Sequence, residues 1–503
     1  MSPSPPFSPP GQTPAEGVAA PMSQRVAKGA VWTMSATVAR IASTILTLPI
    51  LTRLLTPEEF GLVQIAAPFL FLVMAFSDFG IQPALMVSEE PSRRLWSTAF
   101  WAGLVLTTLA MLMLMGAAPL IASYYNEPRA APILQVLSVT LLIGGTMIVP
   151  GTWLIRSMKF QTLAMVEVFA TTAGMVAAIA AAWVGWGVWS LVVQQLVMFS
   201  LKAIALCTVS KAPLRFEFSV ADMKGILGAG WGMTNIRMVN YFSRNADILI
   251  VGRFLGATAL GFYGIAWRVM TMPIEIFANS LFNVLIPAIG QMKNEPHRLK
   301  AALMKAYRTI SLFTFPAMAG ISALAMPLTI FAFGETFAPA AVPIAALAIH
   351  GALQSLVTIQ GTVFMTLGRT DLMFRWAMIS LGCIIGCLLI GVQWGLNGAA
   401  LGYLLASLIC SPLSMRAMMK LIGAQWGDLA DAILVHSLLS ILMGLLVFAL
   451  TLILPDSWSA LAVLAVCIPV GVLIYIGGLL AFDRKAIDDV LGTARSVLMK
   501  RAS

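Results

Sequence analysis

The chain has 503 residues, of which 59% are hydrophobic and only 10% are charged. A soluble globular protein carries about 25% charged residues, so this composition excludes an ordinary soluble enzyme or binding domain and indicates a membrane protein. The formal net charge is +10, and the basic residues lie in short segments between apolar runs. This pattern indicates orientation in a bilayer and argues against nucleic-acid binding.

The first segment, residues 1–24, is rich in proline and serine and contains no apolar core. A secretory signal needs such a core, so the segment is predicted to be a disordered cytoplasmic tail and not a signal peptide. Met22 is a second candidate for the start of translation, because the ordered-looking sequence begins directly after it.

Apolar stretches long enough to cross a bilayer follow one another from residue 28 to residue 481. A membrane-spanning helix needs about 20 such residues, so the fold class is all-α and polytopic, with about fourteen spans and no inserted soluble domain. The predicted spans cover residues 28–52, 62–87, 96–121, 132–155, 163–183, 187–209, 226–252, 257–287, 308–333, 339–366, 373–393, 396–419, 431–454 and 458–481.

Basic residues are distributed unevenly over the connecting segments. With the N-terminus in the cytoplasm, the outer loops hold Arg53, Arg129 and Arg253, whereas the cytoplasmic side collects the others, among which we count Lys202 and Arg308. Positively charged loops stay in the cytoplasm, so both termini are predicted to be cytoplasmic. The five cysteines lie in or beside apolar stretches, and the sequence predicts no disulfide, no metal site and no cofactor.

Two segments resemble each other and predict an internal duplication. Residues 53–61 (RLLTPEEFG) end the first span and residues 253–261 (RFLGATALG) end the seventh, with arginine, leucine and glycine at matching positions. Six helices separate the copies, so both have the same orientation, as in transporters built from two parallel halves. We expect two six-helix lobes, residues 25–215 and 216–425, related by a pseudo-two-fold axis around a central cavity. Residues 426–503 then add two helices and a cytoplasmic tail.

Four arginines lie inside predicted spans and not at their ends: Arg40, Arg237, Arg244 and Arg268. A charge at the bilayer centre costs about 3 kcal/mol or more, so such residues usually face the protein interior or a water-filled cavity. Arg237 and Arg244 are seven residues apart on one helix face, with Asn240 between them at helical spacing. We predict that these five residues bind an anion, because guanidinium groups pair bidentately with phosphate oxygens.

Ion pairing within the protein is the structural alternative for these arginines. Asp247 follows Arg244 by three residues and Glu275 follows Arg268 by seven, so each acid is predicted to share a helix face with an arginine. The other two arginines have no such local partner. The repeat-matched arginines of the outer loops are expected to anchor helix ends at the membrane interface.

Four motifs, in order along the chain, make it similar to the Wzx-type polysaccharide flippases of the MOP exporter superfamily. They are Lys28–Trp32 (KGAVW), Leu54–Gly61 (LLTPEEFG), Asp78–Leu85 (DFGIQPAL) and a longer stretch from Asn245 to Tyr263. The similarity extends over nearly the whole chain after residue 22 and is closest to the exopolysaccharide branch of the family.

This resemblance implies export of an undecaprenyl-diphosphate-linked oligosaccharide for exopolysaccharide or lipopolysaccharide biosynthesis. The lipid-linked glycan moves, on this hypothesis, from the cytoplasmic to the periplasmic leaflet of the bacterial inner membrane by alternating access. Arg40, Arg237 and Arg268 match by position the cationic residues that line the cavity of this family and bind the diphosphate. A polysaccharide polymerase or export complex is the expected protein partner.

The resemblance also implies coupling of export to a gradient of H+ or Na+. Asp247, Glu275 and Asp78 are the candidates for the coupling acid. Ionisable groups within membrane spans commonly mark such ion pathways.

Three other functions were weighed. A MATE-like antiporter of small molecules shares the twin six-helix plan, but that group handles cations and favours an acid in the first span, where this chain carries Arg40. A membrane-bound polymerase or ligase needs a long external loop, and the predicted outer loops are short, so the chain is not expected to be an enzyme. A scaffold without transport activity is the third possibility.

Overall fold

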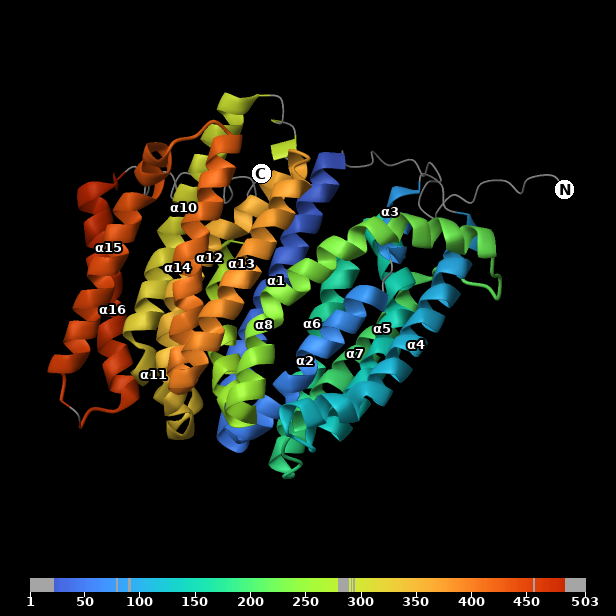
Figure 1. The fold of residues 1–503 in the computed structure, drawn as a ribbon, viewed down its shortest axis with the longest axis horizontal. Helices are drawn as coiled ribbons and strands as arrows, with labels where there is room; N and C mark the ends of the chain where they lie inside the picture. The colour runs from blue at the N-terminus through green and yellow to red at the C-terminus, as the bar shows by residue number, and fades with distance from the viewer. Residues whose placement is uncertain are drawn as a thin grey trace. The chain divides into compact units, whose positions relative to one another are not determined.

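The structure is a computed structural model of the chain. It describes residues 22–77, 80–88, 92–278, 289–290, 292, 295–455 and 457–484, without the side chains of residues 22–31, 75–77, 87 and 224–244. Every regular element in this part of the chain is a helix (Figure 1), which confirms the all-α class. The residues form two compact units, Met1–Gly261 and Phe262–Ser503. The division into a tail, two lobes and an appendage stays a prediction.

The first unit is built from long helices joined by short turns. They are α1 (Met22–Leu54), α2 (Pro57–Ser77), the short α3 (Ile81–Val87), α4 (Arg93–Tyr125), α5 (Ala130–Arg156), α6 (Phe160–Trp183), α7 (Trp189–Ser210) and the first part of α8 (Val220–Pro273). Within this unit α4 packs along α5, and α6 packs along both α7 and α1. Trp96 of α4 and Trp153 of α5 meet edge to face at 5.0 Å in the core.

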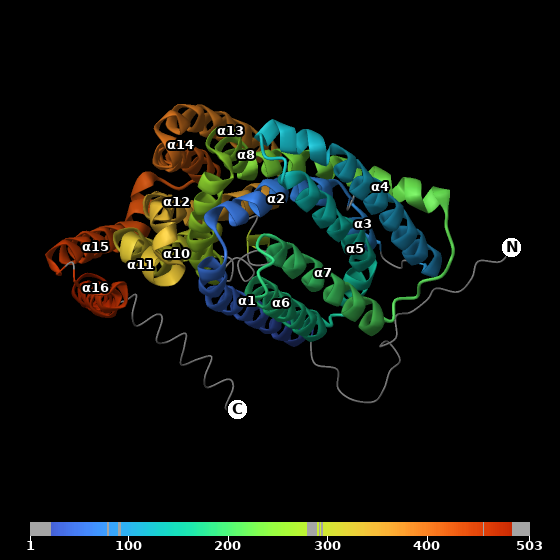
Figure 2. The ribbon, with the colours of Figure 1, turned by 90° about the horizontal axis from the view of Figure 1, so that it is seen from below.

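The second unit contains the rest of α8 and the remaining helices. They are the π-helix η1 (Ile274–Ala278), α10 (Pro296–Ala323), α11 (Ala325–Phe333), the 3-10 turn η2 (Glu335–Ala340), α12 (Ala341–Thr366), α13 (Thr370–Gly391), the 3-10 turn η3 (Val392–Trp394), α14 (Gly395–Leu421), α15 (Trp426–Ile453) and α16 (Ala460–Phe482). Figure 2 shows α15 and α16 beside α10 and α11, and these four helices enclose one apolar core.

The helices are apolar enough to make this a multi-pass membrane protein. In the described part of the chain, eleven helical segments are long and apolar enough to cross a membrane, or twelve if α10 and α11, bent by 80°, count as one span. The segment Thr370–Leu421 contains two of the predicted spans, 373–393 and 396–419. The predicted count of fourteen is not confirmed and stays a prediction.

The two repeated segments break their helices by different local chemistry. Thr56 begins α2 with a capping box, in which its backbone N–H donates to the Glu59 carboxylate at 2.8 Å. The Glu59 N–H donates in return to the Thr56 hydroxyl at 3.4 Å. At the matching position of the second copy Gly256 has φ 80° and ψ −178°, a non-helical conformation open to glycine, and it separates two helices within α8.

Candidate functional site

Arg268 lies on the part of α8 that follows the kink at Gly256, and its side chain is exposed. Its neighbours Ala266, Val269 and Met270 are buried in the second unit. The Arg268 side chain is therefore accessible, although the residues beside it on the helix are buried. A guanidinium on this face of a membrane helix requires water or an anion nearby, because contact with hydrocarbon is costly.

Glu275, the acid predicted to accompany Arg268, lies in η1 directly after Pro273 and is half-buried. Its charge interacts with the guanidinium of Arg268. The short π-helix is a wider turn than an α-helix and is often found at functional sites. Glu275 and Arg268 therefore interact through their charges, and the negative charge of the acid partly offsets the positive charge of the arginine.

Arg40 lies within Trp32–Leu54, the part of α1 that is apolar enough to cross a membrane. Its side chain is half-buried, whereas the adjacent Ile41 is fully packed. The hydroxyl of Thr44, one turn further along α1, donates to the Arg40 carbonyl at 2.9 Å, so this hydroxyl has an acceptor inside the apolar helix. Arg40 thus places a second cation deep in an apolar helix, this time in the first unit.

The remaining predicted residues are clustered on α8 or lie outside the described residues. Arg237, Asn240 and Arg244 belong to the stretch of α8 whose side chains the structure does not describe, and Asp78 lies outside the described residues altogether. Asp247 is described and is only 1% exposed. A carboxylate buried so deeply keeps its charge only beside cations or hydrogen-bond donors. Its pairing with Arg244 stays a prediction.

Lys202 is an intramembrane cation that the sequence analysis assigned to a cytoplasmic loop. The structure corrects this, because Lys202 lies within α7 and its ammonium group is 2.5 Å from the carboxylate of Glu167 on α6. Both side chains are 34% exposed. A flexible lysine reaches an acid on a neighbouring helix, so an acid and a base inside adjacent predicted spans were the only signal from which the pair could have been found.

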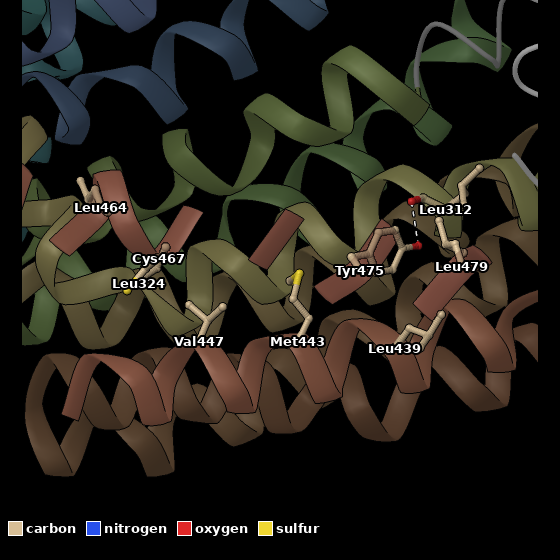
Figure 3. Close-up of a cluster of buried hydrophobic side chains, with 9 residues drawn as sticks. All are labelled: Leu312, Leu324, Leu439, Met443, Val447, Leu464, Cys467, Tyr475 and Leu479. Atoms are coloured by element: carbon tan, nitrogen blue, oxygen red, sulfur yellow. Dashed lines mark hydrogen bonds between the residues drawn. The ribbon is translucent and has the colours of Figure 1, made fainter. Parts of the chain in front are cut away.

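A cavity of about 630 Å³ lies between α10, α11, α15 and α16. Figure 3 shows the buried side chains that surround it, from Leu464 and Leu324 at one end to Leu479 and Leu312 at the other. The Tyr475 hydroxyl donates to the Leu312 carbonyl at 3.0 Å and so presents no unsatisfied polar group. The lining is otherwise hydrocarbon and sulfur, and the volume is typical of sites for small ligands. The sequence alone did not predict this cavity.

The chemistry of the described residues therefore suits an amphiphile. Cationic side chains at Arg40 and Arg268 lie within apolar helices and favour an anionic group. The cavity beside α15 and α16 favours a flexible apolar chain. No group of three or more histidine, cysteine or acidic residues that could hold a metal occurs among the residues that the structure describes.

Comparison with known sequences identifies relatives in the synthesis of bacterial polysaccharides. A family model described as "Polysaccharide biosynthesis protein" matches residues 50–343. The chain is 27% identical over 359 residues to the succinoglycan biosynthesis transport protein ExoT of Rhizobium meliloti (strain 1021), covering 71% of this chain and 72% of that protein. It is 24% identical over 407 residues to the lipopolysaccharide biosynthesis protein WzxC of Escherichia coli (strain K12), covering 79% and 82%.

Comparison with solved structures identifies the fold. The lipid II flippase MurJ, in an inward closed conformation, superimposes with a TM-score of 0.74 and 17% identity over 92% of this chain and 100% of that chain. An inward-facing multidrug resistance transporter of the MATE family superimposes with a TM-score of 0.61 and 15% identity over 77% and 98%. At such identities the likeness shows a shared fold and no more.

Proposed function

Because the chain belongs to the polysaccharide biosynthesis protein family, we propose that it is a flippase that moves a lipid-linked oligosaccharide across its membrane. Both relatives by sequence act in polysaccharide biosynthesis, and one is a transport protein. The structure that superimposes with the higher TM-score is a lipid II flippase. ExoT is named a transport protein and MurJ a flippase, and the function proposed here is transport without covalent chemistry.

The proposed substrate is an undecaprenyl-diphosphate oligosaccharide. Its isoprenoid chain needs apolar surface, its diphosphate needs cations, and its glycan needs a hydrated path. The observation that carries the proposal is Arg268, an exposed arginine on a membrane helix whose neighbouring residues are buried. An arginine of this kind is expensive to keep in a membrane unless an anion uses it.

The diphosphate is proposed to bind to Arg40, Arg237 and Arg268, with Asn240 and Arg244 as further contacts. Guanidinium groups donate paired, charge-assisted hydrogen bonds to phosphate oxygens, and such bonds contribute about 1.5–3 kcal/mol each. The arginines thereby replace the water that the diphosphate leaves behind at the membrane surface. Their arrangement around one central cavity is part of this proposal.

The isoprenoid chain is proposed to occupy the cavity between α10, α11, α15 and α16. Lipid tails are as apolar as the cavity wall, so transfer of the chain from lipid into the cavity yields little free energy. We infer that the cavity positions the substrate rather than tightening its binding. Affinity then comes from the charged groups.

Transport is proposed to proceed by alternating access, with lobes 25–215 and 216–425 exposing the site first to the cytoplasm and then to the periplasm of a bacterium with an inner membrane. Both termini are proposed to lie in the cytoplasm, because loops rich in basic residues are expected to stay on that side. Coupling to H+ or Na+ through Asp247, Glu275 or Asp78 is part of the proposal. So is association with a polysaccharide polymerase or export complex.

The test is a flipping assay with purified protein in lipid vesicles. A fluorescent polyprenyl-diphosphate sugar is added to both leaflets, and an external quencher reports the molecules that reach the outer leaflet. We expect Arg40→Ala, Arg237→Ala and Arg268→Ala each to slow flipping about tenfold or more, which corresponds to loss of about 1.4 kcal/mol of binding to the moving diphosphate. Arg268→Lys should retain part of the rate, because it keeps the charge but not the paired geometry.

Arg129→Gln is the matched control, because it removes an arginine that lies in the short connection before α5 and pairs with Glu58, in the first turn of α2, at 2.5 Å. Two results contradict the proposal: wild-type protein that accelerates no polyprenyl-diphosphate sugar, and a triple arginine variant that flips at the wild-type rate. The second result, together with normal polysaccharide output in cells, would favour the scaffold hypothesis. Resistance to cationic dyes that Asp247→Asn abolishes would favour the antiporter hypothesis.

A further inference from the structure

A chain of polar side chains links three helices at the end of the apolar cavity. Arg308 and Ser311 lie on α10, His436 lies on α15, and Asp483 caps the end of α16. The Ser311 hydroxyl is 2.9 Å from Nδ1 of His436, and Nε2 of the same ring is 3.4 Å from Oδ2 of Asp483. Arg308 forms an ion pair with the other carboxylate oxygen, Oδ1. Leu312, directly after Ser311, and Leu479, one turn before Asp483, line the cavity.

The hydrogen bonds around His436 assign its tautomer. The Ser311 hydroxyl donates to the Arg308 carbonyl at 3.0 Å, so its oxygen is left to accept the proton on Nδ1 of His436. Nε2 then carries a lone pair that faces the carboxylate of Asp483, and this nitrogen has no hydrogen-bond partner in the described structure. The imidazole is only 1% exposed. The site therefore lacks one proton between a nitrogen and an oxygen that both accept.

The surrounding charges set Arg308 and a protonated His436 in competition for the Asp483 carboxylate. The Asp483 carboxylate contacts both Arg308 and His436, and with a neutral imidazole the charges of Arg308 and Asp483 offset each other. A proton on Nε2 adds a positive charge, which is costly to bury unless another cation moves into water. The Arg308 side chain is 34% exposed and can do so, whereas His436 cannot.

Other polar groups lie near His436 on the helices packed around it. Helix α15 packs against α10 and α16. Besides the residues named above, α16 contributes Tyr475, whose hydroxyl donates to the Leu312 carbonyl, and α15 contributes Ser440 one turn further along. A separate ion pair joins α10 to α15 near their first turns, where the Lys300 ammonium group is 2.6 Å from the Asp428 carboxylate.

We propose that His436 and Asp483 form a proton-binding site, and that the bound proton transfers Asp483 from Arg308 to His436. The proton enters from the exposed edge of Asp483, binds Nε2, and forms an Nε2–H···Oδ2 hydrogen bond. Arg308 then turns toward water, and α10 loses its ion pair with Asp483 beside the apolar cavity, while the hydrogen bond from Tyr475 to the Leu312 carbonyl still joins α10 to α16. The inference rests on the proposed function in one respect: it links proton binding to the cavity that the isoprenoid chain is proposed to occupy.

Proton binding is tested by NMR of protein labelled with 15N in the histidine rings. The chain has only His297, His350 and His436, so the His436 signals are assigned by their loss in His436→Gln. Between about pH 8 and pH 5, the range in which histidines change charge, we expect the His436 signals to move to the imidazolium position. In Asp483→Asn the signals should stay at the neutral position over the same range.

Arg308→Gln and Lys300→Gln provide a matched pair. Both remove a cation from α10 that pairs with an acid on a neighbouring helix, but only Arg308 competes for Asp483. Arg308→Gln should let the His436 signals reach the imidazolium position at higher pH than in the wild type, and Lys300→Gln should leave them unchanged. A His436 ring that stays neutral down to pH 5 in a folded protein, or that titrates equally in Asp483→Asn, overturns the inference.

Flipping assays separate this inference from the proposed function. If the protein flips the lipid and His436 titrates, the wild-type rate should change several-fold across the NMR transition, and this change should disappear in His436→Gln. If flipping is absent but the NMR transition depends on Asp483, the proton site stands and the proposed function fails. If flipping occurs with the same pH dependence in His436→Gln, the function stands and the proton site is not linked to it.

Discussion

Gly61 lies so close to the backbone carbonyl of Ala257 that no side chain fits between them. Gly261 stands in the same relation to the carbonyl of Pro57. Positions 57 and 61 match positions 257 and 261 in the internal repeat, so the contact is reciprocal. A reciprocal contact is what residues beside a pseudo-two-fold axis produce. The glycines that identify the repeat in the sequence are therefore the residues that let its two copies touch.

The first prediction concerns this contact. Gly61→Ala and Gly261→Ala each place a methyl group inside the backbone of the opposite segment, so the helices have to separate. We expect each substitution to destabilise the protein by about 1–3 kcal/mol, as overpacking does elsewhere. Thermal unfolding in detergent, followed by loss of monodisperse protein, measures the effect.

Gly116→Ala is the control for these variants. Gly116 lies on α4, and a methyl group at this position meets no atom within 4 Å. It should leave the unfolding temperature unchanged or raise it slightly, because alanine favours a helix over glycine by about 1 kcal/mol. Equal unfolding temperatures in Gly61→Ala and Gly116→Ala would show that the close contact is absent from the protein in detergent.

The all-α polytopic fold followed from the sequence because length and hydropathy alone determine membrane helices. One local break was placed well: the non-helical backbone at Gly256 separates two helices within α8, between the predicted end at residue 252 and the predicted start at residue 257. Another break was not predicted. The bend of 80° between α10 and α11 lies inside one predicted span, 308–333, because a bend leaves the apolar pattern of a span intact.

The candidate site was predictable only in part. Arg268 and Glu275 were found because a charge inside an apolar run is visible in the sequence, as is its spacing along one helix. The Lys202–Glu167 pair joins two helices, and the cavity beside α15 and α16 depends on how four helices pack. Contacts of this kind depend on tertiary structure, so helical periodicity does not reveal them.

The second prediction concerns the pair of Lys202 and Glu167. Each single substitution, Lys202→Gln or Glu167→Gln, leaves the other charge without its partner between α6 and α7. Because both side chains are one third exposed, we expect a loss of about 1 kcal/mol in each variant. The double variant should lose less than the sum, since no charge is then left alone. Additive losses in a double-mutant cycle would show that the pair does not contribute to stability.

The third prediction concerns the length of the lipid chain. Ala317→Phe on α10 fills part of the apolar cavity without adding charge. We expect the flipping rate to fall several-fold for a long polyprenyl diphosphate and to change little for a short-chain analogue that does not need the cavity. Leu473→Phe is the control, because Leu473 of α16 is 70% exposed and is not among the residues lining the cavity. The same loss for both chain lengths would place the isoprenoid chain elsewhere.

The last prediction concerns Glu275, which interacts with Arg268 and so competes with any anion that binds there. Glu275→Gln removes the competing charge and keeps the shape of the side chain. An ion pair with one exposed partner contributes about 1 kcal/mol, so a diphosphate probe should bind about fivefold more tightly to the variant. Tighter binding also slows release, so the flipping rate at saturating substrate should fall while the apparent affinity rises.

Arg268→Gln should abolish the gain in affinity when it is combined with Glu275→Gln, because the acid acts through the arginine. Titration calorimetry with a short-chain diphosphate measures the affinity, and an unchanged or weaker binding in Glu275→Gln would mean that Arg268 does not contact the anion.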